Sequence, residues 1–168
     1  CGGSKKDEGP TNAYLTGVHV AASSVRFDFK SKPQQVAVSW QPPSRLNECG
    51  SGRPIRLRGH AFVVVHFRPA ASAEIKGEQV VLTYTGPKRL HGPGPVLDVA
   101  RSCDFEADLG WAIGVERRHP LPVERAGTAV TLSLCSAAFL PPGRDAGPDR
   151  PAAARPLTAG GPAAPPAY

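Results

Sequence analysis

Hydrophobic positions recur with a period of two along most of this chain, which predicts β-strands rather than helices. Apolar residues alternate with polar ones in several short segments separated by turns that contain Gly or Pro. These segments are residues 25–30, 35–40, 55–58, 78–85, 96–100, 111–116 and 128–135. Residues 61–67 (AFVVVHF) are instead apolar on both faces, which favours a central strand. We therefore expect an all-β fold, an antiparallel β-sandwich or small barrel.

The strand pattern is confined to residues 14–140, and the two ends of the chain differ from it in composition. Residues 1–13 are mostly Gly, Ser and charged residues, which predicts a flexible tether. In residues 141–168, 20 of 28 residues are Pro, Gly or Ala, with no hydrophobic periodicity. Such a segment cannot bury enough apolar surface to offset its ordering entropy. We expect one folded domain between a tether and a disordered tail.

Cys1 is followed by Gly2, Gly3 and Ser4, and this start resembles that of a mature bacterial lipoprotein. The resemblance implies acyl chains on Cys1 and a place at the cell membrane, on its extracytoplasmic face. Two or three acyl chains give stable anchoring where a single chain would not. The alternative is that the sequence begins at a cysteine without such a role.

Three further cysteines lie in the expected domain, and their odd number predicts one disulfide and one free thiol in an exported protein. Cys49 precedes a Gly-Ser-Gly loop, Cys103 follows a strand, and Cys135 ends the last strand. Three pairings are open, and loop positions favour Cys49 with Cys103. A zinc site is disfavoured, because no Cys-x-x-Cys or Cys-x-x-His spacing occurs.

One longer motif is residues 50–65 (GSGRPIRLRGHAFVVV), and a second runs from Asp104-Phe105-Glu106 through residues 109–115 (LGWAIGV) into 117–123 (RRHPLPV). Both motifs resemble those of the AMIN-like domain lipoproteins of actinobacteria. Residues 16–18 resemble the opening strand of that family. One departure is that residues 21–24 (AASS) stand where the family carries an Arg-His-x-x-Phe/Tyr-Asp-Arg stretch.

The resemblance implies a β-sandwich akin to the AMIN module that targets some cell-wall amidases to the envelope. It also implies an extracytoplasmic, lipid-anchored setting. It does not imply amidase activity, because AMIN is the targeting part of those enzymes and not their zinc-dependent catalytic part.

The motifs of common hydrolases are missing, so we expect no catalytic residues, no metal site and no cofactor. The five histidines are scattered without a His-Glu-x-x-His motif, and no Gly-x-Ser-x-Gly sequence occurs. Asp104, Glu106 and Asp108 alternate, but without the glycine and distal glutamate of a calcium loop they favour a solvated acidic turn.

Basic residues carry the remaining functional signal, since 20 Lys and Arg against 14 Asp and Glu give a net charge of +6. Eight of them fall at expected outward or loop positions and are candidates for binding an anionic ligand: Arg26, Lys30, Arg56, Arg58, Lys88, Arg89, Arg117 and Arg118. Outside a cell, phosphate-bearing wall glycans and anionic lipids are the fitting partners. Nucleic acid is not expected, because the aromatic stacking residues are lacking. The alternative is a merely solubilising surface.

We therefore expect a non-catalytic, lipid-anchored envelope protein that binds cell-wall glycan or an envelope partner. The contact would involve the basic residues, and Trp111 would either join it or lie in the core, as its alternation with Ile113 and Val115 favours. Two other interpretations stay open: a cell-wall hydrolase or its fragment, and a structural protein that docks a partner at a strand edge.

Overall fold

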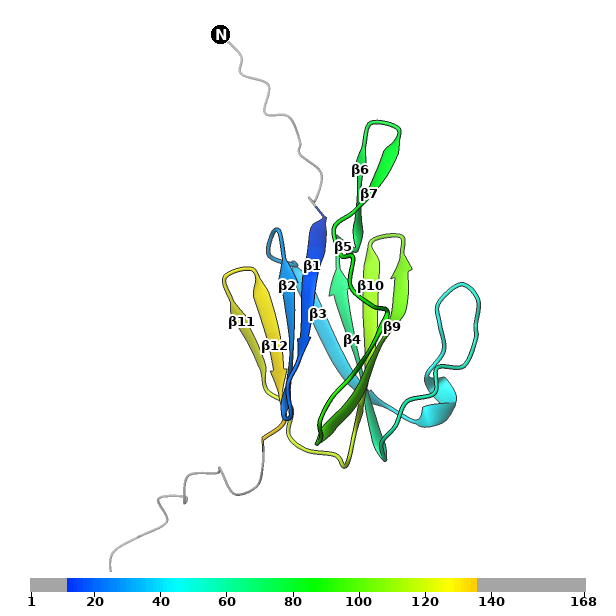
Figure 1. Ribbon diagram of the computed structural model, residues 1–168, viewed down its shortest axis with the longest axis vertical. Helices are drawn as coiled ribbons and strands as arrows, with labels where there is room; N and C mark the ends of the chain where they lie inside the picture. Colours follow the sequence, from blue (N-terminus) through cyan, green and yellow to red (C-terminus); the bar gives the residue numbers. More distant parts are fainter. Residues whose placement is uncertain (1–11, 136–168) are drawn as a thin grey trace, which may run out of the picture.

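A computed structural model describes residues 12–135 of the chain, and these residues form two five-stranded sheets packed face to face (Figure 1). The first sheet has the order β11-β12-β2-β1-β5 and the second β3-β4-β10-β9-β8. The strands of the first sheet are β1 (Ala13–Val20), β2 (Ser24–Phe29), β5 (Ala70–Ala71), β11 (Val123–Ala126) and β12 (Ala129–Ser133). Those of the second are β3 (Gln35–Gln41), β4 (Ala61–Arg68), β8 (Arg89–His91), β9 (Val96–Phe105) and β10 (Asp108–Val115).

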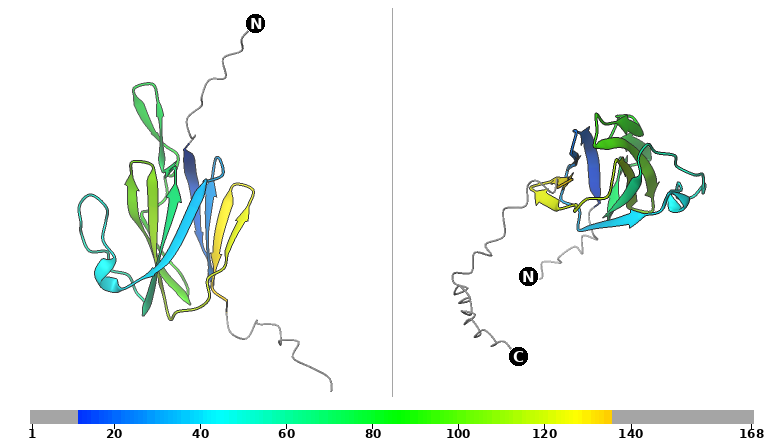
Figure 2. Two further views of the ribbon diagram at one scale, coloured as in Figure 1. Left: turned by 180° about the vertical axis from the view of Figure 1, so that it is seen from behind. Right: turned by 90° about the horizontal axis from the view of Figure 1, so that it is seen from below.

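The expected antiparallel β-sandwich is confirmed. Among the strand pairs of the described residues, only β1 and β5 run parallel, and the others are antiparallel. A separate hairpin of β6 (Ala73–Lys76) and β7 (Gln79–Leu82) projects from one end of the sandwich (Figures 1 and 2). Cys1, nearly all of the expected tether 1–13 and the whole expected tail 141–168 lie outside the described residues.

The core lies between the sheets and is made by the inward positions of the alternating strands. Phe27 of β2 contacts Phe67 of β4 with ring centroids 4.9 Å apart, and Trp111 of β10 with centroids 5.9 Å apart. Trp111 is completely buried, so it belongs to the core and offers no surface for a ligand. Its alternation with Ile113 and Val115, which are also buried, had favoured this placement.

The outer face of the second sheet carries a smaller apolar cluster, which explains why β4 is apolar on both faces. The segment 42–60 crosses this face and lays Leu46, Ile55 and Leu57 over Phe62 and Val64. It begins with a 3-10 helix, η1 (Pro43–Arg45). The central position expected for residues 61–67 is confirmed, because β4 pairs with β3 on one side and β10 on the other.

The strand expected at residues 55–58 is wrong, although the alternation there is real. Ile55 is buried against the sheet face, while Arg56 and Arg58 point outward. Residues 55–58 pack on the outer face of the second sheet, and within the described range 12–135 they belong to no strand of either sheet. Instead, the backbone N–H of Arg58 donates to the Asp98 carboxylate (2.8 Å). One-sided burial of any extended segment gives the same alternation as a strand.

The strand expected at residues 78–85 is shorter than the pattern suggested. Only Gln79–Leu82 is β7, and its partner is β6 rather than a strand of either sheet. Tyr84 turns back into the core and packs edge-on against Trp111 with ring centroids 5.7 Å apart. The apolar run therefore serves two environments, an exposed hairpin and a buried anchor.

Candidate functional site

A groove lies at the end of the sandwich where β3 ends and β4 begins. We call it the Trp40 groove; its volume is about 490 Å³. It is lined by Trp40, Gln41, Pro42, Pro43, His60, Ala61, Phe62, Arg117 and Arg118. The guanidinium carbon of Arg118 lies 5.1 Å from the centroid of the Trp40 ring, within the range of a cation–π contact.

Strand register brings the parts of this groove together from three places in the sequence. Trp40 lies opposite Val63, and Ala61 lies opposite Val115, the last residue of β10. The two arginines follow within three residues of the end of β10, so they emerge beside the start of β4. The backbone N–H of His60 donates to the Val115 carbonyl oxygen (2.9 Å), and this bond holds His60 at the groove beside the end of β10.

The chemistry of the groove suits an anionic ligand that also has an apolar face. Among residues 12–135, no acidic residue lines it. Within residues 12–135, neither Arg117 nor Arg118 forms an ion pair, so both guanidinium groups keep their donors for a ligand. A guanidinium presents a planar fork of donors that matches phosphate and carboxylate oxygens. The partly buried indole of Trp40 adds a rigid apolar surface.

A second group of basic residues surrounds Asp98 near the edge strand β8. The side chain of Asp98 is 2% exposed and accepts hydrogen bonds from Nε of Arg58 (2.9 Å) and its backbone N–H (2.8 Å). Nδ1 of His91 lies 2.7 Å from the same carboxylate. Burial alone would raise the pKa of Asp98, but these hydrogen bonds outweigh it and lower the pKa below its usual value. This carboxylate therefore holds the surrounding cations in place.

The eight basic residues predicted from the sequence divide into three groups. The first group lies around β8 and Asp98 and consists of Arg56, Arg58, Lys88 and Arg89. The Arg89 side chain donates to the Arg56 carbonyl oxygen (2.8 Å), and the Lys88 carbonyl oxygen accepts from the backbone N–H of Arg101. Arg26 and Lys30 belong to the other sheet, at and just after β2, and pair with Asp28 (2.8 Å) and Glu74 (2.9 Å). Of the eight predicted residues, only Arg117 and Arg118 line the Trp40 groove. Ligand binding by any group stays a prediction.

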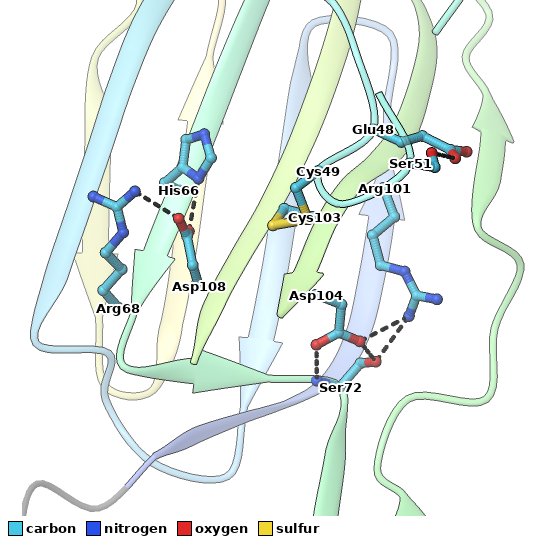
Figure 3. The surroundings of a disulfide bond; sticks show 10 residues. All are labelled: Glu48, Cys49, Ser51, His66, Arg68, Ser72, Arg101, Cys103, Asp104 and Asp108. Carbon is cyan, nitrogen blue, oxygen red and sulfur yellow. Dashed lines mark hydrogen bonds and ion pairs between the residues drawn. A yellow bond between two sulfur atoms is a disulfide. The ribbon is translucent and has the colours of Figure 1, made fainter. Parts of the chain in front are cut away.

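A disulfide joins Cys49 to Cys103 across 54 residues, with Cα atoms 5.1 Å apart (Figure 3). This is the pairing that loop placement favoured. It pins segment 42–60 to β9, and Cys135 is free within the described residues. A pocket of about 280 Å³ lies beside the bridge, between the segment and the outer face of the second sheet.

Ser102 and His66 line this pocket, and His66 contacts Asp108, so the residue types of Ser/His/Asp catalysis lie at or beside it. Nδ1 of His66 lies 2.7 Å from Asp108, which also accepts from Arg68 (2.6 Å), as Figure 3 shows. Burial would raise the pKa of Asp108, but the bonds to Arg68 and His66 lower it overall. Ser102 is nearby, but its hydroxyl oxygen is buried and has no hydrogen-bond partner among residues 12–135. A nucleophile needs access to its substrate, and this oxygen has none.

Two carboxylates of the expected acidic turn, those of Asp104 and Asp108, form hydrogen bonds with other residues of the domain. Asp104 and Asp108 flank the β9–β10 turn and point to different sides, the first toward Ser72 and Arg101 and the second toward His66 and Arg68 (Figure 3). Within the described part of the chain, no three His, Cys, Asp or Glu residues are grouped to hold a metal ion. Among those residues there is also no helix long and apolar enough to span a membrane.

Comparison with protein families shows that the family model of the AMIN-like domain matches residues 13–132 of this chain. The chain belongs to the AMIN-like domain family. Comparison with curated proteins and with solved structures gave no match. Membership of the AMIN-like family is compatible with a non-catalytic protein of the cell envelope, and it agrees with the resemblance carried by residues 50–65 and 104–123.

Sequence reasoning missed part of the Trp40 groove. It identified Arg117 and Arg118 but not Trp40, His60 or the two prolines. The available signal was the proline pair that follows Gln41, because Pro42 and Pro43 stop the alternating run just after a tryptophan. Nothing in the sequence places that tryptophan beside arginines almost 80 residues later.

Proposed function

We propose that this AMIN-like protein is a non-catalytic, lipid-anchored envelope protein that binds an anionic cell-wall glycan in the Trp40 groove. The observation that carries the proposal is the Arg118 guanidinium over the Trp40 ring at 5.1 Å. Arg117 stands beside it, and none of the described residues that line the groove is acidic. A partly exposed indole beside two guanidinium groups fits a sugar that bears phosphate or carboxylate.

The lipid anchor is the second part of the proposal. Its support is Cys1 with the small residues Gly2, Gly3 and Ser4 and the polar segment after them. Mass spectrometry of the protein purified from its native membrane tests this part. A first residue carrying two or three acyl chains is expected, and an unmodified thiol on Cys1 would refute the anchor without touching the groove.

Binding to purified, insoluble cell-wall material tests the groove. The full chain with Cys1→Ser removes any contribution from acyl chains, and we expect it to be retained by walls at low salt and released at about 0.5 M salt, where exposed charges are screened. The double variant Arg117→Glu/Arg118→Glu should bind at least about tenfold more weakly, since two charge-assisted contacts become repulsive.

A matched control makes this test specific. Arg56→Glu/Lys88→Glu changes the net charge by the same amount, and within residues 12–135 neither parent residue forms an ion pair. These two residues lie near β8 and outside the Trp40 groove. The control should lose only a small part of the binding. Equal loss in both variants would show a diffuse charge effect and refute the groove as the site.

A further inference from the structure

Exposed apolar side chains are concentrated at one end of the sandwich. Among the described residues, Ile75, Val80, Leu82 and Phe105 are 74%, 68%, 60% and 62% exposed. Three belong to the β6–β7 hairpin, and Phe105 ends β9 at the turn beside it. The backbone N–H of Ala70 in β5 donates to the carbonyl oxygen of Ala107 in that turn (2.9 Å), so hairpin base and turn are neighbours.

The hairpin is amphipathic. Its register places Ile75 opposite Val80 and Ala73 opposite Leu82, so these four side chains share one face. The other face carries Glu74, which pairs with Lys30, the residue after β2 (2.9 Å), and with Lys76 (3.6 Å). The charged face is thus tied back to the domain, while no residue of the described part, 12–135, covers the aliphatic face. A two-stranded ribbon with such a face is normally packed against something.

Strong contacts at its base hold the hairpin in this projecting position. Ser72 is 1% exposed, and its hydroxyl donates to the Asp104 carboxylate while accepting from Arg101 (2.8 Å), as Figure 3 shows. The backbone N–H groups of Thr83 and Tyr84 both donate to the Ser72 carbonyl oxygen, at 2.9 and 3.1 Å. Tyr84 is then locked against Trp111. The exposed face therefore does not depend on a loose loop.

We propose that the hydrophobic face of the β6–β7 hairpin, together with Phe105, inserts into the interfacial region of a lipid bilayer. This inference rests on the lipid anchor proposed above. β1 begins at Ala13, which pairs with Ala70 only three residues before the hairpin starts (Figure 1). Ala13 follows Cys1 by only twelve residues, and twelve residues can span at most about 43 Å. A hairpin with four residues in each strand extends roughly 13 Å. Acyl chains on Cys1 would therefore keep the apolar face of the hairpin close enough to the bilayer to insert into it.

Insertion of the hairpin would fix the orientation of the domain relative to the membrane. Strand β10 runs from Asp108 at the hairpin end to Val115 at the Trp40 groove, a span of eight residues or roughly 27 Å. The apolar end and the basic groove therefore lie at opposite ends of the sandwich. With the hairpin in the bilayer, Arg117 and Arg118 would face away from the membrane, toward the cell wall.

Partitioning of the full chain into lipid vesicles tests the inference without the anchor. Cys1→Ser removes the acylation site, and vesicles of phosphatidylcholine with phosphatidylglycerol are the probe. We expect measurable binding at millimolar lipid that persists in high salt, because the inserted face carries no charge. Ile75→Ser/Val80→Ser/Leu82→Ser in the Cys1→Ser chain should weaken partitioning by about tenfold or more. Val123→Ser, an exposed aliphatic on β11, is the control and should change it little.

The possible outcomes distinguish bilayer insertion of the hairpin from dimerisation of the chain and from acylation of Cys1. Absence of vesicle binding by the Cys1→Ser chain, or equal binding by the triple variant, would overturn the inference even where mass spectrometry finds acyl chains. A concentration-dependent dimer that the triple variant abolishes would assign the face to a second copy of the chain instead. Hairpin-dependent binding without acylation of Cys1 would uphold the inserted face and refute only the anchor. Unchanged circular dichroism of the triple variant confirms that its core still folds.

Discussion

Removal of the Cys49–Cys103 disulfide is expected to destabilise the domain by about 4 kcal/mol. The bridge closes a loop across 54 residues, and its main effect is to restrict the unfolded chain. The loop-closure relation gives about 3 kcal/mol for a loop of 15 residues and about 4.7 for one of 100 residues, so this bridge falls between them. The perturbation is Cys49→Ala/Cys103→Ala in the full chain.

Urea unfolding, followed by circular dichroism, measures this effect. A domain of this size has a dependence on urea of about 2 kcal/mol per molar, so the midpoint should fall by roughly 2 M. Cys135→Ala is the control, because this half-buried cysteine is outside the bridge, and its midpoint should move far less. Reduction of the wild-type chain should reproduce the shift of the double variant.

A midpoint that falls by less than about 0.5 M would refute the reasoning, because the loop-closure contribution would then be absent. The native domain should still form at urea concentrations below the new midpoint, because the apolar contacts of Leu46 and Ile55 with the sheet face do not require the bridge. Because the bridge acts on the unfolded chain, core amides that exchange only through global unfolding should exchange up to about 10³-fold faster without it. Unchanged exchange rates of these core amides would contradict this origin of the effect.

Two further predictions concern the outer face of the second sheet. Asp98→Asn should destabilise the domain by about 1–3 kcal/mol at neutral pH, because a buried acceptor of hydrogen bonds from Arg58 and His91 loses its charge. The folded-state pKa of Asp98 is lowered, so its stabilisation is complete above the ordinary aspartate pKa of 3.8 and is lost as pH falls through the folded-state pKa. The gap between wild type and variant in urea unfolding should therefore narrow in acid, and a constant gap would contradict the assignment. Gly114→Ala should cost about 2 kcal/mol or more, since its Cβ would lie 2.1 Å from the Arg58 carbonyl oxygen. A thermal unfolding midpoint within 1 °C of wild type would show that segment 42–60 yields easily.

Most of the sandwich was predictable because its strands bury one face and wet the other. The pattern in residues 25–30 gave β2, with Val25, Phe27 and Phe29 inward. Strands with weaker alternation were missed, among them β8 and β11, where every residue except Leu90 is exposed. At residues 55–58 the pattern was clear but the interpretation was wrong, because alternation reports one-sided burial and not hydrogen bonding between strands.

The site was less predictable, because it is assembled from segments whose proximity depends on register. Arg117 and Arg118 could be chosen as basic loop residues, but only the pairing of β3 with β4 and of β4 with β10 brings Trp40 near them. Asp98 gave no sequence signal at all: it is an acidic residue within a strand, and its burial under Arg58 and Arg89 is a tertiary effect. The exposed face of the β6–β7 hairpin was likewise hidden, since the same residues would suit a buried strand.

The central claim is that an anionic wall glycan binds in the Trp40 groove, and indole NMR signals test it most directly. The chain has two tryptophans, so the spectrum of the ¹⁵N-labelled protein has two indole signals, assigned with Trp40→Phe. Titration with a soluble, phosphate-bearing fragment of cell-wall glycan should shift the Trp40 signal and the amides of Arg117 and Arg118, and leave buried Trp111 unchanged. An unmoved Trp40 signal at saturating glycan, or shifts confined to the β8 edge, would contradict the claim.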